Sequence, residues 1–252
     1  MNTAKRPRHS TESGYARGEE TRHRIIEAAA DLFGEHGFDG ASTRDIATRA
    51  GVNAPALQYY FENKEGVYRA CIEAMVDEAW QRFGPPVTHA QRVLAGDADT
   101  ATLIDAFMSI QEALADGAFA KVNKPNRRLF FAREQAGYEP ESASQIINSR
   151  LRDPLNLASA ALVGKISGQP GNDPVTVIRA FSLHGQLLVF HIAHRTTLTL
   201  LGWESMNAKN AELIKSTVRA QTRLLLERWA AERDALLAPA KKTRRVAPVK
   251  KS

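Results

Sequence analysis

Apolar residues recur at the spacing of an α-helix along nearly the whole chain, and this pattern constrains the fold more than any other feature of the 252-residue sequence. Near the N-terminus, for example, Ile25, Ala29 and Leu32 lie four and three positions apart and mark one helical face. We find no alternating runs of β-branched residues and no Asn-Gly pair that would indicate a hairpin. The sequence therefore predicts an all-α protein.

Residues that begin or end helices mark four predicted helices before residue 84. Thr43 and Asn53 are expected as the N-caps of the second and third helices, and Gly51 supplies the left-handed turn between them. The stretch Gly-Pro-Pro at 84–86 is expected to end the fourth helix, because proline lacks the backbone donor that a helix needs. The expected helical ranges are 21–35, 43–50, 53–61 and 64–83, followed by 99–116, 123–136, 141–164, 174–197 and 206–237.

The second and third predicted helices are joined by a turn short enough to form a helix-turn-helix. Ala47 is small enough to let the two helices cross closely. In this motif the second helix enters the major groove of DNA and exposes its polar side. That placement explains Gln58 and Tyr59, because glutamine pairs with adenine and a tyrosine hydroxyl donates to phosphate. A tyrosine pair by itself is more often part of a protein core, so the interpretation depends on the whole motif.

Residues 18–75 resemble the N-terminal domain of TetR-type transcriptional regulators. The resemblance rests on the stretch TRHRIIEAAADLFGEHGFDGASTRDIATRAGVNAPALQYYFENKEGVYRACIEA. Tyr59, Phe61 and Lys64 match the family pattern. Gln58 stands where the family usually has tyrosine, and Tyr60 where it usually has histidine. We therefore expect Gln58 to help set the operator sequence. The stretches NAPALQYYF and FAREQ are also similar to the CecR-like subgroup.

This resemblance implies an N-terminal three-helix DNA-binding domain with a helix-turn-helix, followed by a C-terminal helical ligand-binding and dimerisation domain. The implied function is a ligand-responsive transcriptional repressor that binds a near-palindromic double-stranded DNA operator as a homodimer and is released by a small-molecule effector. An activator, or a DNA-binding regulator without an effector, are the alternatives left open. The DNA contacts carried over from the family fall on Thr21, Thr43, Arg44, Asn53, Ala54, Gln58, Tyr59 and Lys64.

The positive charge of the chain is concentrated at its two ends. The formal net charge is +6, yet residues 1–17 and 238–252 together carry more positive charge than that. Basic tails of this kind either stay solvated or contact a polyanion such as DNA. The expected organisation is a disordered basic arm over 1–17, the DNA-binding domain over 18–66, the effector and dimerisation domain over 67–237, and a disordered basic tail over 238–252.

The predicted second domain offers a candidate ligand pocket and a candidate dimer surface. The pocket candidates are Phe107, Phe130, Phe131 and Arg133, because small-molecule sites are mostly apolar with a few polar anchors. The alternative for the three aromatic residues is an ordinary core position. The two last helices are predicted to pair with those of a second copy in a four-helix bundle. His184, His191 and His194 share one helical face, and we interpret them as interface or pocket residues rather than metal ligands.

Several protein classes find no support in the sequence. It has no glycine-rich phosphate loop, nucleophile elbow or metal-ligand cluster, so we expect no enzymatic activity, catalytic residue, cofactor or metal. Its single cysteine, Cys71, excludes an intramolecular disulfide. No run of 18 apolar residues and no secretory signal are present, so we expect a cytoplasmic protein without membrane spans.

Overall fold

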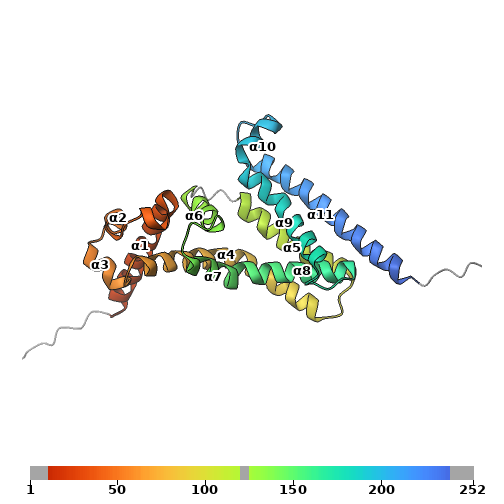
Figure 1. Cartoon of the computed structure of the whole chain (residues 1–252), viewed down its shortest axis with the longest axis horizontal. Helices are drawn as coiled ribbons and strands as arrows, with labels where there is room; N and C mark the ends of the chain where they lie inside the picture. The colour runs from red at the N-terminus through yellow and green to blue at the C-terminus, as the bar shows by residue number, and fades with distance from the viewer. Residues whose placement is uncertain (1–10, 120–124, 239–252) are drawn as a thin grey trace, which may run out of the picture. The chain divides into compact units, whose positions relative to one another are not determined.

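The computed structural model describes residues 11–119 and 125–238, which form helices and short connections without a strand (Figure 1). The prediction of an all-α fold is therefore confirmed. Residues 1–10 of the predicted basic arm, and the predicted basic tail beyond Ala238, lie outside the described residues. The helices are α1 (Thr11–Gly40), α2 (Thr43–Ala50), α3 (Ala54–Tyr60), α4 (Lys64–Ala95), α5 (Thr100–Phe119), α6 (Pro125–Gln135), α7 (Glu141–Ile147), the π-helix η1 (Asn148–Arg152), α8 (Asp153–Ser167), α9 (Pro174–Ile192), α10 (His194–Leu201) and α11 (Ala208–Leu237).

The helices group into two compact units, and each unit combines two separate stretches of the chain. Unit 1 contains the chain up to Pro85 together with residues 120–155, and unit 2 contains residues 86–119 together with the chain from Asn156 onward. The sequence instead suggested a boundary between residues 66 and 67. The difference arises because α6 packs against α1, a long-range contact that helical periodicity does not reveal.

Helix α4 continues through the two prolines that were expected to end it. The predicted end near residue 83 is wrong, because the helix runs from Lys64 to Ala95. A proline removes one helical hydrogen bond and restricts the residue before it. Here the next turns bury Val87 and Ala90 completely, and this burial keeps the segment helical.

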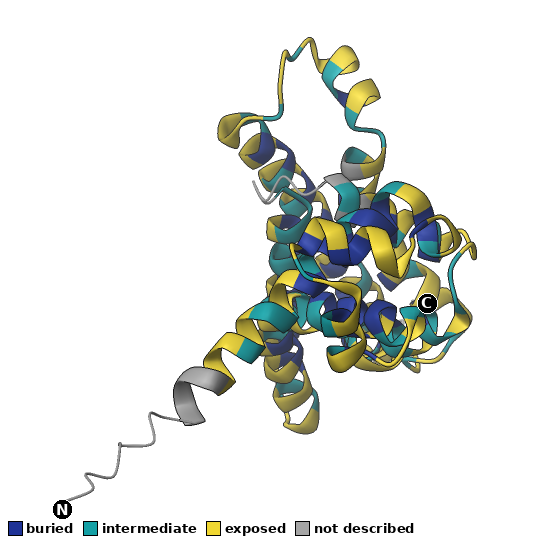
Figure 2. Ribbon diagram, turned by 90° about the vertical axis from the view of Figure 1, so that its left-hand side faces the viewer, coloured by how far each residue is buried: buried dark blue, intermediate teal, exposed yellow. Residues whose placement is uncertain are grey.

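The helix predicted over 141–164 is three elements, α7, η1 and α8, and two other predicted helices differ as well. Helix α1 starts at Thr11, so residues 11–17 of the predicted arm belong to a helix, and exposed residues dominate its described first turns (Figure 2). The helix predicted over 174–197 is two helices, α9 and α10, which meet at Ala193 with a bend of 73°. No single helix in the described part of the chain is long and apolar enough to span a membrane, although this bent pair meets the length and composition criterion together.

The core of unit 1 centres on aromatic rings from three helices. Phe33 of α1 and Phe130 of α6 both contact Tyr68 of α4, with ring centroids 4.9 Å and 5.1 Å away, and Phe38 lies 5.0 Å from the same ring. Helices α1 and α6 cross so closely that a Cβ atom on Gly34 would lie 2.1 Å from the carbonyl oxygen of Asn126. Gly34 is therefore required for the packing of α6 on α1.

In unit 2, helices α5, α9 and α11 lie side by side (Figure 1). Ion pairs join α5 to α11 along their length: Arg223 with Asp105 at 2.6 Å, Arg219 with Glu112 at 2.6 Å, and Lys215 with Asp116. Along these ion pairs the residue numbers rise on α5 as they fall on α11, so the two helices run antiparallel.

Candidate nucleic-acid interface

The turn between α2 and α3 is fixed by hydrogen bonds within a few residues of it. The Ser42 hydroxyl oxygen accepts from the Asp45 amide at 3.1 Å, so Ser42 is the N-cap of α2 and the predicted cap Thr43 is wrong. Ser42 has the extended backbone that a cap needs, whereas Thr43 is already helical. The predicted cap Asn53 is confirmed, since its Oδ1 accepts from the Ala56 amide at 2.8 Å. Gly51 has a φ of 65°, as its predicted left-handed turn requires.

This turn gives α3 one buried and one exposed side. Leu57 of α3 is buried, as are Ile46 and Ala47 of α2, so the two helices pack through these residues. The two residues after Leu57 consequently point to solvent: Gln58 is exposed, and Tyr59 is 84% exposed. An exposed polar and aromatic side on the second helix of such a pair is what entry into a DNA groove requires.

All eight predicted DNA contacts belong to unit 1, but they differ in how freely they can reach a ligand. Thr21 is half-buried and its hydroxyl donates to the Arg17 carbonyl at 2.9 Å. The ammonium group of half-buried Lys64 donates to the Phe38 carbonyl at 3.0 Å and lies 4.4 Å from the centre of the Phe38 ring. The exposed members are Thr43 and Arg44 in α2, the cap Asn53, and Ala54, Gln58 and Tyr59 in α3.

The C-terminal end of α1 is tied to other elements of unit 1. The Glu35 carboxylate accepts from Arg49 of α2 at 2.8 Å and from Asn126 of α6 at 3.0 Å. The hydrogen bond from Arg49 holds the pKa of Glu35 below its usual value. The Phe38 amide donates to the Glu139 carboxylate at 3.1 Å, and burial raises the pKa of that carboxyl. Helix α6 and the residues after it therefore help to fix the position of α2.

The four predicted ligand residues are divided between the two units. Phe107 belongs to unit 2, whereas Phe130, Phe131 and Arg133 lie on α6 in unit 1. Phe130 is fully buried in the aromatic core of unit 1, and Phe131 packs against the same core. Arg133 reaches the Glu35 carbonyl at 3.5 Å. The two α6 phenylalanines thus have the surroundings of ordinary core residues, which was the alternative to a place in a ligand pocket.

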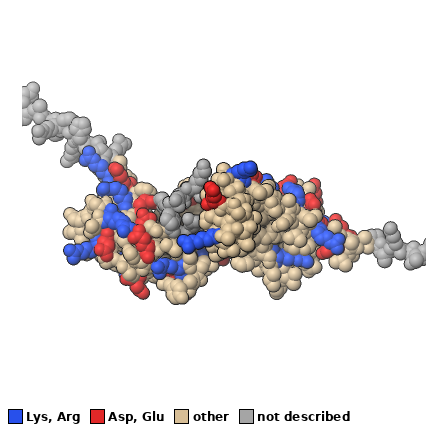
Figure 3. Space-filling view, turned by 90° about the horizontal axis from the view of Figure 1, so that it is seen from above, with Lys and Arg blue, Asp and Glu red and all other residues tan. Residues whose placement is uncertain are grey.

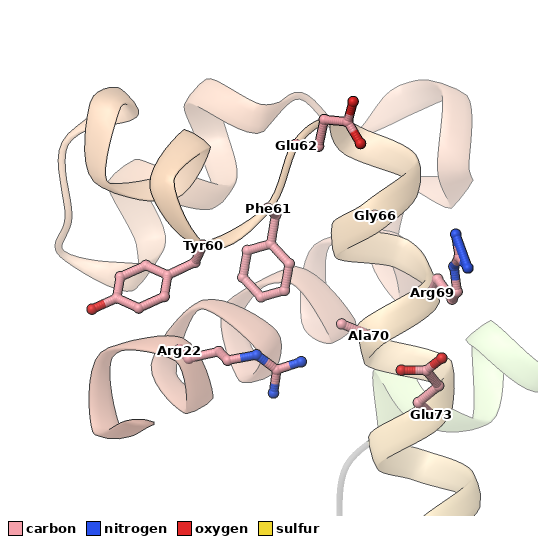
Figure 4. Close-up of a pocket in the computed structure, with 8 residues that line it drawn as sticks. All are labelled: Arg22, Tyr60, Phe61, Glu62, Gly66, Arg69, Ala70 and Glu73. Carbon is pink, nitrogen blue, oxygen red and sulfur yellow. The ribbon is translucent and has the colours of Figure 1, made fainter. Parts of the chain in front are cut away.

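A groove that the sequence did not suggest lies beside the C-terminal end of α3 (Figure 4). Its volume is about 290 Å³, and Figure 4 shows Arg22 reaching below the Phe61 ring from α1. The Arg22 guanidinium lies 5.5 Å from the centre of that ring, within the range of a cation–π interaction. The lining residues are Arg22, Tyr60, Phe61, Glu62, Gly66, Arg69, Ala70 and Glu73. Two of these are basic and two are acidic, so the groove has no net charge.

The face of unit 1 seen in Figure 3 has no concentration of a single charge sign. In Figure 3 the basic and acidic side chains around α1 to α3 are interspersed on the face shown, rather than gathered by sign. Support for DNA binding is therefore geometric and comes from three features: the capped helix pair, the exposed side of α3 and the exposed start of α2. Backbone amides at the start of a helix, such as those of Thr43 and Arg44, are suited to bind phosphate.

Unit 2 holds an open surface pocket and a polar cluster that the sequence did not indicate. The pocket has a volume of about 560 Å³ and is lined by Leu94, Ala161, Gly164, Lys165, Gly168, Gln169 and Gly171. The polar cluster lies among α5, α9 and α11 and includes buried Gln111 and Thr222. His184, which the sequence placed at an interface or pocket, stacks on Phe107 with ring centroids 5.4 Å apart. No group of three or more metal-binding side chains occurs within the described residues.

Two family models match the sequence, one for each half of the chain. Residues 25–71, which include α2 and α3, match the model described as bacterial regulatory proteins, tetR family. Residues 103–228, half of the chain, match the C-terminal domain of the HTH-type transcriptional dual regulator CecR.

Individual relatives agree with these matches. The HTH-type transcriptional dual regulator CecR of Shigella flexneri is 29% identical over 212 residues, which span 84% of this chain and 93% of the relative. The class A tetracycline repressor from transposon 1721 of Escherichia coli is 48% identical over 54 residues, or 21% of this chain and 25% of the repressor. A crystal structure of AibR with isovaleryl coenzyme A and operator DNA superposes with a TM-score of 0.56 at 17% identity, covering 80% of this chain and 97% of AibR. That superposition shows a shared fold.

Proposed function

Because the chain belongs to the TetR family of bacterial transcriptional regulators and has a C-terminal domain of the CecR type, we propose that it is a ligand-responsive repressor that binds a near-palindromic operator as a homodimer. The observation that carries this proposal is the exposed side of α3, with Gln58 and Tyr59 beside the buried Leu57. The matching families are regulators and not enzymes, as the sequence predicted. A repressor acts where its operator is, so the proposal places the chain in the cytoplasm.

In this proposal α3 lies in the major groove and its exposed residues divide the work of recognition. Gln58 reads a base edge, since a glutamine amide pairs two-pronged with adenine. Tyr59 and the exposed start of α2, with Thr43 and Arg44, bind phosphates and set the position of α3. Thr21 and Lys64 bind flanking phosphates, and Lys64 does so while its Phe38 contacts hold the ammonium group at the start of α4.

Exposed apolar residues on α9 and α11 support the proposed homodimer. Ile178 and Phe181 of α9 are 64% and 68% exposed, and Leu213 and Leu224 of α11 are 57% and 67% exposed. Large apolar side chains gathered on neighbouring helices usually mark a surface that another protein covers. Covered by the same two helices of a second copy, they would form a four-helix bundle. Sedimentation at micromolar concentration should show a dimer, and a monomer would contradict this part of the proposal.

The proposal of release by an effector is supported by unit 2 and by AibR, a protein of the same fold. The AibR structure contains both isovaleryl coenzyme A and operator DNA, so in that protein a small molecule and DNA bind to the same fold. For this chain we propose an effector site in the CecR-type part, residues 103–228. Fragments of DNA from the source genome, selected by the protein and then challenged with candidate small molecules, would identify operator and effector in one experiment. Failure to enrich any sequence would contradict specific binding.

Activation of transcription is a second candidate function. The relative from Shigella flexneri is named a dual regulator, and its similarity covers most of this chain. A repressor and an activator bind DNA in the same way and differ in where the operator lies relative to the promoter. The position of the selected operators distinguishes the two: overlap with promoters supports repression, and sites upstream of promoters support activation.

A further inference from the structure

Unit 2 contains a layer of uncharged polar side chains between three helices. Gln111 of α5 is 2% exposed, and Thr222 of α11 is fully buried. The Gln111 amide nitrogen donates to the Thr222 hydroxyl oxygen at 2.7 Å and to the Leu183 carbonyl of α9 at 3.3 Å. One glutamine therefore connects α5 to both of its neighbours, and it does so with its nitrogen alone.

Two atoms of this layer are buried without a hydrogen-bond partner among the described residues. They are the Oε1 atom of Gln111 and the Nε2 atom of His184. An unpaired buried polar atom destabilises a protein, and most such atoms in folded proteins are paired. Core packing alone would favour an apolar side chain at either position. The two atoms therefore need another explanation, and a bound molecule that pairs with them supplies one.

The two unpaired atoms belong to one cluster with an aromatic wall. Phe107 and Gln111 lie one turn apart on the same face of α5. The Phe107 ring stacks on His184 with an interplanar angle of 27°. Gln111 bonds to the carbonyl of Leu183, the residue directly before His184. Phe107, Gln111 and His184 thus meet at one level of α5 and α9.

The cluster carries no charge that could balance a charged ligand. Burial lowers the pKa of His184 to about 4, so the imidazole is neutral at pH 7. The charged residues next along the same helices are paired with each other: Glu112 with Arg219, and Asp105 with Arg223, each at 2.6 Å. Bringing an unbalanced charge into such a site is strongly unfavourable.

We propose that Gln111 and His184 form the polar end of a small-molecule site in unit 2, whose ligand is an uncharged aromatic molecule with an O–H or N–H group. The ligand donates this hydrogen to Gln111 Oε1, its polar atom pairs with His184 Nε2, and its ring lies against Phe107. Because both polar atoms are buried, the ligand enters through a local opening between α5 and α9. Calling this ligand the effector rests on the proposed function, but its binding does not require DNA.

Three probes of similar size test the proposed ligand class on DNA-free protein. Phenol has a ring and a hydrogen-bond donor, toluene has the ring alone, and benzoate has a ring and a negative charge. Binding is measured by titration calorimetry and by the midpoint of thermal unfolding. Phenol should bind at least about tenfold more tightly than toluene or benzoate, because a site built around buried polar atoms rejects a molecule that leaves them unpaired. Equal binding of the three, or no binding of phenol, would overturn the proposal.

Two variants assign the selectivity to the named atoms. Gln111→Leu should bring phenol and toluene to the same affinity, while the exposed control Gln221→Leu should keep the preference of the wild type. His184→Phe keeps a ring against Phe107 and removes the unpaired nitrogen. It should raise the unfolding midpoint by a few degrees and weaken phenol binding. Retained phenol preference in both Gln111→Leu and His184→Phe would contradict the site.

Operator release is scored separately from binding. Phenol that binds but leaves an operator complex intact would count against the effector role and leave the site supported. Phenol that neither binds nor releases DNA would count against the site alone, since another molecule could still act elsewhere in unit 2.

Discussion

The two units place polar side chains in opposite ways. Unit 1 presents them on the outside of α3, where Gln58 and Tyr59 stand exposed next to one buried leucine. Unit 2 keeps Gln111 and Thr222 inside, between α5, α9 and α11, where Gln111 Oε1 and the nearby His184 Nε2 are left unpaired. The outside group suits a large polyanion that approaches from solvent, whereas the inside group suits a small neutral molecule. The proposed function uses this difference, with DNA recognition in unit 1 and effector recognition in unit 2.

The largest expected effect concerns how α6 supports the exposed surface of unit 1. Gly34→Ala would place a Cβ atom 2.1 Å from the backbone oxygen of Asn126, so α1 and α6 must separate. We expect the free energy of unfolding to fall by about 3 kcal/mol, measured by urea denaturation. The control Gly66→Ala adds a Cβ atom 3.7 Å from its nearest neighbour and should cost nothing or stabilise by up to about 1 kcal/mol. Equal stability of the two variants would show that α6 does not pack there.

The next effect concerns the buried layer of unit 2 and follows from the lowered pKa of His184. The His184 imidazole takes up a proton near pH 4 in the folded protein and near pH 6.5 in the unfolded chain. As pH falls between these values, protonation therefore stabilises the unfolded state relative to the folded state. Stability should be complete above pH 6.5 and lower by about 2 kcal/mol at pH 5. Comparing the denaturation of wild type and His184→Phe at pH 7 and pH 5 isolates this contribution. The same loss in both proteins would show that His184 is not its source.

The smallest effect concerns Lys64, whose ammonium group is already held by Phe38. Lys64→Ala should weaken binding to all DNA sequences alike and lower the salt dependence of binding by about one unit, because one phosphate contact is lost. Lys209→Ala removes an exposed lysine from unit 2 and should leave the salt dependence unchanged. An unchanged slope for Lys64→Ala would mean that the lysine serves only to hold the segment before α2.

Local features of the fold were predictable from the sequence, and contacts between distant segments were not. Asn53 and Gly51 were identified correctly because caps and left-handed turns depend on neighbouring residues. The choice of Thr43 over Ser42 failed by one position, since both carry a hydroxyl and only the backbone distinguishes them. The end of α4 was wrong because burial of Val87 outweighed two prolines.

The candidate sites show the same limit. The exposed side of α3 could be inferred because one short motif contains it. The return of α6 to α1 could not, and so Phe130 was grouped with Phe107 although the two lie in different units. The burial of Gln111 could not be predicted, because a glutamine on a helix usually faces solvent. It depends on contacts with distant residues, such as the hydrogen bond to Thr222.

The most direct test of the account measures which base pairs Gln58 reads. Wild type, Gln58→Ala and the exposed control Gln145→Ala are titrated with the selected operator and with versions changed at each base pair, followed by fluorescence anisotropy. We predict that Gln58→Ala loses about 1–3 kcal/mol of discrimination at one or two base pairs and keeps it elsewhere, while Gln145→Ala matches the wild type. If Gln58→Ala discriminates every position as the wild type does, or weakens operator and random DNA equally, then the exposed side of α3 is not the surface that reads DNA.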